Sequence, residues 1–68
     1  MTHEERYEAI VKEYNKWTKR YDAAEDTLDY DVMSLCAFMS NAIVAAVVKS
    51  NNQNLKTYFQ HSVACYFH

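Results

Sequence analysis

The chain has 68 residues, of which half are hydrophobic and 24% are charged, with a formal net charge of −2 and neither glycine nor proline. A chain this short forms one domain, residues 1–68, and the absence of glycine excludes phosphate-binding loops, dinucleotide-binding loops and nucleophile elbows. Hairpin turns favour glycine and proline, so the composition favours an all-α fold. We therefore expect no enzyme active site and no cofactor, and the slight negative charge argues against nucleic acid as a partner.

The first predicted helix runs from about residue 3 to about residue 28. Thr2, followed three residues later by Glu5, has the pattern of a capping box, which starts a helix. Apolar and mostly aromatic residues then recur at alternating spacings of three and four, as in a helix that buries one side. This seam consists of Tyr7, Ile10, Tyr14, Trp17, Tyr21, Ala24 and Leu28.

The second predicted helix, residues 31–49, carries no charge from Val32 to Val48, and Asp29 or Asp31 is its expected N-cap. Apolar side chains lie nearly all round it, which is typical of the centre of a soluble bundle or of a membrane span. The uncharged run makes about 25 Å of helix, which is short for a bilayer core of about 30 Å. We therefore expect a buried central helix.

The third predicted helix, residues 53–67, is amphipathic and follows a turn at Asn51-Asn52. Together the segments predict a small three-helix bundle. Because the second helix has two apolar faces and the first helix is longer, one subunit leaves apolar surface uncovered, and we expect self-association, most simply as a two-fold dimer. The predicted self-association residues are Tyr7, Tyr14, Trp17, Tyr21, Met33, Val44 and Val48.

Four residues have the chemistry of zinc ligands, namely Cys36, His61, Cys65 and His68. Their spacing is that of a helix and includes no paired-cysteine motif, so we expect no bound metal. We expect both cysteines to be reduced core residues at one level of the hairpin between the second and third helices. The charged start of the chain is unlike a secretory signal, which predicts a cytoplasmic location, that of the host cell if the chain is viral.

Charge is distributed unevenly, since all nine acidic residues lie at or before Asp31. Like charges at close spacing cost helix stability, and capping explains only one or two of them, so we predict that the acidic segment binds a partner protein with a basic surface. The predicted partner-binding residues are Asp22, Glu25, Asp26, Asp29, Tyr30 and Asp31. The alternative binding surface is a basic stripe on the first helix, whose cations could bind phosphate groups. It consists of Lys12, Lys16, Lys19 and Arg20.

The sequence thus predicts a non-enzymatic protein-binding module, a small inhibitor or regulator that acts by stoichiometric contact. In size and style it resembles small phage-encoded inhibitors of host or defence proteins, which implies an anti-defence or host-takeover role. The run from Arg6 to Ile10 resembles part of the helical-hairpin domain of phage cyclic-nucleotide sponges, and we transfer no site residues from it. Two alternatives stay open: a small membrane-associated protein with residues 31–49 inserted, and an oligomeric protein that sequesters a ligand or nucleotide.

Overall fold

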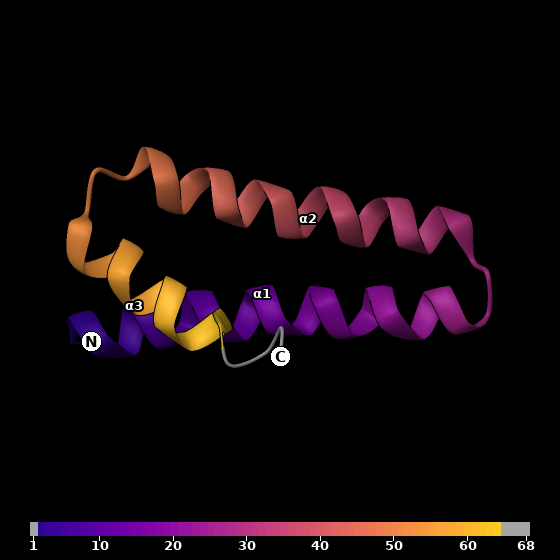
Figure 1. Ribbon diagram of the computed structural model, residues 1–68, viewed down its shortest axis with the longest axis horizontal. Coiled ribbons are helices and arrows are strands. Elements are labelled where there is room, and N and C mark those ends of the chain that lie inside the picture. The colour runs from indigo at the N-terminus through magenta and orange to yellow at the C-terminus, as the bar shows by residue number, and fades with distance from the viewer. Residues whose placement is uncertain (1, 65–68) are drawn as a thin grey trace.

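The computed structural model describes residues 2–64, which form three helices joined by two short turns (Figure 1). Helix α1 spans His3–Asp26, α2 spans Tyr30–Lys49 and α3 spans Gln53–Ala64. Helices make up 89% of the described residues, and these residues contain no strand. The predicted all-α three-helix bundle is therefore confirmed. Residues 65–67, at the end of the third predicted helix, lie outside the described part of the chain.

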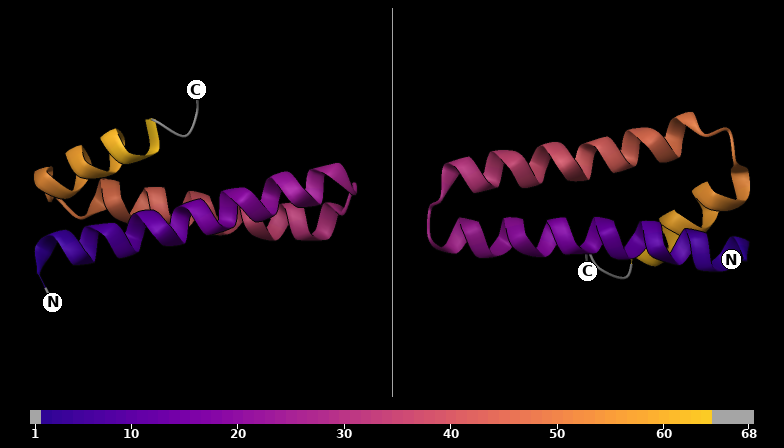
Figure 2. Two further views of the ribbon diagram at one scale, coloured as in Figure 1. Left: turned by 90° about the horizontal axis from the view of Figure 1, so that it is seen from below. Right: turned by 180° about the vertical axis from the view of Figure 1, so that it is seen from behind.

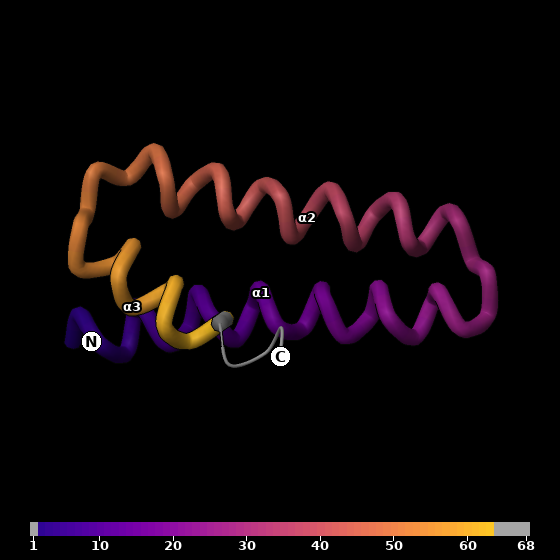
Figure 3. Tube along the Cα trace, in the orientation of Figure 1, coloured from indigo at the N-terminus to yellow at the C-terminus, as the bar shows by residue number. Residues whose placement is uncertain are grey.

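Helices α1 and α2 form an antiparallel hairpin and lie side by side along their lengths (Figures 1 and 3). With 24 residues, α1 is about 36 Å long, which accounts for the 37 Å longest dimension of the molecule. Helix α3 has 12 residues and lies on one face of the hairpin, near the start of α1 and the end of α2 (Figure 2). The molecule therefore has a three-helix end, beside α3, and a two-helix end, at the turn between α1 and α2.

Short polar side chains start α1 and α2. The Thr2 hydroxyl accepts a hydrogen bond from the backbone N–H of Glu5 at 3.1 Å, as the predicted capping pattern requires. The Asp29 carboxylate accepts one from the N–H of Val32 at 3.4 Å, so Asp29, rather than the other candidate, is the N-cap of α2.

Asn52 starts α3 and also ties it to α1. Its side-chain oxygen accepts a hydrogen bond from the Leu55 N–H at 3.1 Å, while its amide group donates to the Tyr7 hydroxyl at 3.2 Å. The Tyr7 ring lies 5.7 Å from the ring of Tyr58, between centroids. The amino-terminal turns of α1 and α3 are thus joined by both a polar and an aromatic contact.

Two residues in the left-handed conformation reverse the chain in a sequence without glycine. Asn51 has a φ of 55° and Leu28 a φ of 57°. Asparagine visits this region readily, whereas for leucine it costs about 1–2 kcal/mol. The backbone around Leu28 forms both hydrogen bonds of a Schellman motif, from Leu28 N–H to Glu25 C=O at 3.1 Å and from Asp29 N–H to Ala24 C=O at 2.9 Å. The first helix therefore ends two residues earlier than predicted.

The main apolar cluster lies at the three-helix end. It contains the buried side chains of Val11 and Tyr14 from α1, Val47 from α2, and Leu55 and Phe59 from α3. The rings of Tyr14 and Phe59 pack edge to face with their centroids 5.1 Å apart, a preferred arrangement of aromatic rings. Because all three helices contribute, burial in this cluster holds α3 on the hairpin.

Small residues are buried at the two-helix end. Ala24 of α1 is 6% exposed and Cys36 of α2 is 1% exposed. Cys36 therefore acts as a small core residue, which agrees with its predicted structural role. Cys65, its predicted neighbour across the hairpin, lies outside the described residues.

Helix α2 is not the buried central helix that the sequence predicts. Only 11% of the residues in its apolar 18-residue window are buried, and Leu35 and Phe38 are more than half exposed. Because α3 is short and packs at one end, most of α2 has α1 alone as its neighbour. The stripe of α2 that faces inward is narrow and includes a polar residue, Ser40. It consists of Met33, Cys36, Ser40, Ile43 and Val47, each buried or half-buried.

Replacing Leu28 with glycine is expected to raise the free energy of unfolding by about 1 kcal/mol, because glycine adopts positive φ without a Cβ clash. Leu28 is 64% exposed, so its side chain contributes little burial. Urea denaturation followed by circular dichroism measures the change. Leu28→Ala is the matched control, since it keeps the Cβ, and it should stay within about 0.5 kcal/mol of the wild type. A destabilised Leu28→Gly variant would contradict the prediction.

Replacing Phe59 with alanine is expected to lower the free energy of unfolding by about 3–5 kcal/mol, a large part of the stability of so small a domain. The change removes the aromatic side chain of α3 that packs on Tyr14. The control variant Thr57→Ala lies at an exposed position of the same helix. It should change the free energy of unfolding by no more than about 0.5 kcal/mol in the same urea titration. Equal losses in the two variants would show that this cluster does not hold α3.

Candidate functional site

The six residues predicted to bind a partner lie around the turn between α1 and α2, at the two-helix end (Figure 1). This surface, the acidic end, consists of Asp22, Glu25, Asp26, Asp29, Tyr30 and Asp31. All six residues are exposed. The hairpin therefore concentrates five carboxylates at the two-helix end. Helix α3 lies at the other end of the molecule.

Four of the five carboxylates at the acidic end have no structural partner. Asp29 accepts the capping hydrogen bond from α2. Asp22, Glu25, Asp26 and Asp31 form no ion pair and no side-chain hydrogen bond with another residue in the range 2–64. The amino-terminal dipole of α2 stabilises Asp31, which lies in the first turn of that helix, and all four charges are available to cations from outside the chain.

Two large side chains in the same segment of the chain as these carboxylates are exposed. Leu28 is 64% exposed and Tyr30 is 67% exposed. Sequence reasoning named Tyr30 but missed Leu28, which it assigned to the apolar seam of the first helix. A single leucine inside an otherwise polar segment was the signal that could have identified it.

The basic stripe is exposed on α1 and comprises Lys12, Lys16, Lys19 and Arg20. Two of its cations pair with carboxylates of the same helix, Lys12 with Glu8 at 3.4 Å and Lys16 with Glu13 at 3.5 Å. Lys16 also lies 5.2 Å from the centre of the Trp17 ring, within the range of a cation–π interaction. These local contacts explain part of the stripe without a ligand.

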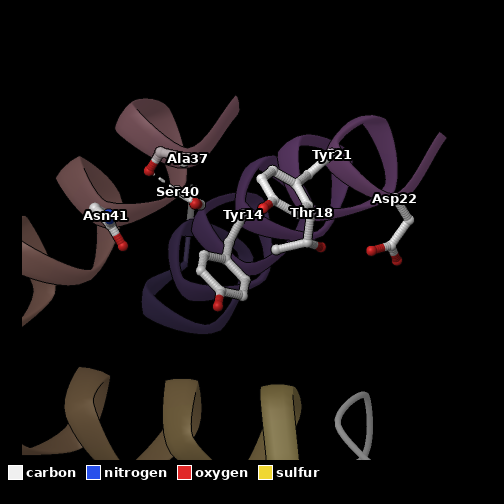
Figure 4. A pocket seen from close by; sticks show the side chains of 7 residues that line it. All are labelled: Tyr14, Thr18, Tyr21, Asp22, Ala37, Ser40 and Asn41. Carbon is white, nitrogen blue, oxygen red and sulfur yellow. Dashed lines mark hydrogen bonds between the residues drawn. The ribbon is translucent and has the colours of Figure 1, made fainter. Parts of the chain in front are cut away.

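A groove of about 440 Å³ lies between α1 and α2, next to the face on which α3 packs (Figure 4). Its lining residues are Tyr14, Thr18 and Tyr21 with Asp22 from α1, and Ala37, Ser40 and Asn41 from α2. The lining includes a carboxylate and no cation. The groove therefore lacks the positive charge that binding of a phosphate or nucleotide requires.

The seven residues predicted for self-association have different surroundings. Tyr14 belongs to the core cluster, whereas Val44 and Val48 are exposed on α2. The other four, Tyr7, Trp17, Tyr21 and Met33, are half-buried. Self-association stays a prediction, and sequence reasoning did not select two other large apolar side chains of α2 that are more than half exposed, Leu35 and Phe38.

The candidate zinc ligands are not brought together within the described residues. Cys36 is buried and His61 is exposed, while Cys65 and His68 lie outside the described range. Residues 2–64 contain no group of three or more histidine, cysteine, aspartate or glutamate side chains that could hold a metal ion.

Helix α2 is long and apolar enough to cross a membrane, by length and composition alone, with a mean hydropathy of 1.8 in its most apolar window. A buried core helix meets the same criterion, but α2 is mostly exposed. Most of the apolar surface of α2 is therefore open to solvent in the single subunit.

Comparisons with protein-family models, with curated proteins and with solved structures give no match. Only the chemistry of this chain's own residues therefore indicates a function.

Proposed function

We propose that the chain is a non-enzymatic, cytoplasmic protein-binding module, an inhibitor or regulator that acts by stoichiometric contact through its acidic end. The observation that most supports this proposal is the exposure of Leu28 and Tyr30 among carboxylates without partners. Tyrosine is enriched at protein-binding hot spots, and a polar, solvent-accessible rim usually surrounds such an anchor. Such a mode of action is also in the style of phage-encoded inhibitors, which the chain resembles in size.

The charge of the acidic end determines the kind of partner that it fits. Five carboxylates at one end produce a negative potential that attracts a basic surface and accelerates encounter with it. The side chains of Leu28 and Tyr30 then fill apolar pockets on that surface. The proposed partner is therefore a protein with a basic patch around an apolar depression.

Membrane association through α2 is the main alternative, and the hairpin argues against it. If α2 crossed a bilayer in this fold, α1 would enter the bilayer too, because the helices lie side by side (Figure 2). Helix α1 carries Lys16, Lys19 and Arg20 near its middle, and a cation near the centre of a bilayer costs about 2.5–3.5 kcal/mol. Insertion would therefore require the hairpin to open. Ligand or nucleotide sequestration has less support still, since the groove beside Tyr21 has no cation, and a second groove between α1 and α2 has one, Arg20, together with the carboxylate of Asp29.

The experiment begins with immobilised wild-type chain, on which proteins from a host lysate are captured and identified by mass spectrometry. A triple variant, Asp22→Asn, Glu25→Gln, Asp26→Asn, removes three negative charges that attract the cations of the partner. It should bind the captured partner about tenfold more weakly. Its affinity should also depend less on salt concentration. Isothermal titration calorimetry at two ionic strengths measures both effects.

The matched control is Glu4→Gln, Glu5→Gln, Glu8→Gln, which makes the same change in net charge at the opposite end of α1. It should bind the partner as the wild type does. Equal affinity of the acidic-end variant and the wild type would refute this site and direct attention to the basic stripe. Circular dichroism establishes that both variants remain helical.

A further inference from the structure

The outward side of α2 carries a regular seam of exposed residues. Four are apolar and two are charged, and successive members are four, three, four, three and four residues apart, which is a heptad pattern. The outer seam consists of Asp31, Leu35, Phe38, Ala42, Ala45 and Lys49, all exposed. Phe38 is 70% exposed and Leu35 is 52% exposed. A helix face that exposes large apolar side chains in a heptad pattern is typical of a surface that pairs with another helix.

The two charges of the outer seam mark its ends. Asp31 and Lys49 are five turns of 3.6 residues apart, so they lie on one line of the helix. Between them α2 carries no charge. If a second α2 lay against the first in the opposite direction, Asp31 of each copy would face Lys49 of the other. The charges would then form two ion pairs that flank an apolar contact.

The sizes of the apolar residues fit the same arrangement. Leu35 and Ala45 are equally far along the helix from Ser40, and so are Phe38 and Ala42. Antiparallel pairing about the level of Ser40 therefore places each large side chain opposite an alanine of the second copy, which allows close packing. Parallel pairing would place phenylalanine on phenylalanine, like charges on like charges, and the two acidic ends side by side.

We propose that α2 pairs with α2 of a second copy, antiparallel and through the outer seam. The paired helices lie between the two copies of α1, and the two acidic ends lie at opposite ends of the dimer. The occupant is a second copy because the seam complements itself in both charge and size. This inference does not rest on the acidic end binding a partner, since Asp31 is the one acidic-end residue that takes part in the pairing, whereas Leu28, Tyr30 and the acids of α1 do not.

Exchange of the end charges tests the proposal. Asp31→Lys and Lys49→Asp, each alone, turn both ion pairs into repulsive contacts and should weaken the dimer about tenfold. An equimolar mixture of the two variants restores both attractive pairs and should dimerise as the wild type does. Sedimentation equilibrium over a range of concentrations measures these constants. The control variants Asp26→Lys and Lys12→Asp make the same charge changes on α1 and should leave the dimer unchanged.

A second set of variants tests the packing and keeps the fold intact, because the altered side chains are exposed in the single subunit. Phe38→Ala should weaken the dimer about tenfold or more, since it removes the largest side chain of the contact. Ala42→Phe should also weaken it, because two phenylalanines then face each other. The double variant Phe38→Ala, Ala42→Phe exchanges large for small on both copies and should restore the dimer. Circular dichroism verifies that each variant is helical.

Three results would overturn the proposal. One is a wild-type chain that stays at the 8.0 kDa monomer mass at every concentration. A second is a dimer whose constant neither charge exchange nor Phe38→Ala changes. A third is a monomer that binds neutral phosphatidylcholine vesicles in a flotation assay and loses that binding with Phe38→Ala, which would assign the outer seam to lipid.

Discussion

The edge-to-face contact of Tyr14 with Phe59 lies in the apolar cluster on which the rest of the structure depends. The cluster joins all three helices, and its position at one end follows from the lengths of the helices, 12 residues in α3 against 24 in α1. At the other end the small residues Ala24 and Cys36 suffice to close a two-helix hairpin. The position of this cluster therefore determines which parts of α1 and α2 are covered by α3 and which remain exposed.

Two exposed surfaces result, and their chemistry differs. The acidic end combines carboxylates with Leu28 and Tyr30, a composition suited to a partner of opposite charge. The outer seam of α2 is apolar with one charge of each sign at its ends, a composition suited to a copy of itself. Antiparallel pairing would also separate the two acidic ends, because it places them at opposite ends of the dimer. The two surfaces share one residue, Asp31, so in the dimer four carboxylates with Leu28 and Tyr30 remain for a partner at each acidic end.

Leu28 connects the fold with the proposed function. A chain without glycine must place another residue in the left-handed conformation to end α1, and here a leucine occupies it with most of its side chain exposed. Glycine would stabilise the turn but would remove an apolar side chain from the acidic end. The turn is therefore a place where stability and binding favour different residues.

The sequence by itself determined what depends on contacts within about one helical turn. Thr2, Asp29 and Asn51 act on neighbours a few residues away, so the starts of α1 and α2 and the second turn were predicted correctly. The acidic end was likewise predictable in composition, since its residues are close in the chain. Which side of α2 faces inward was not predictable, because apolar residues surround this helix and periodicity cannot distinguish its sides. Only the tertiary structure decided that, since the inward side of α2 is the one that packs on α1, and most of the residues that meet in this packing are far apart in the sequence.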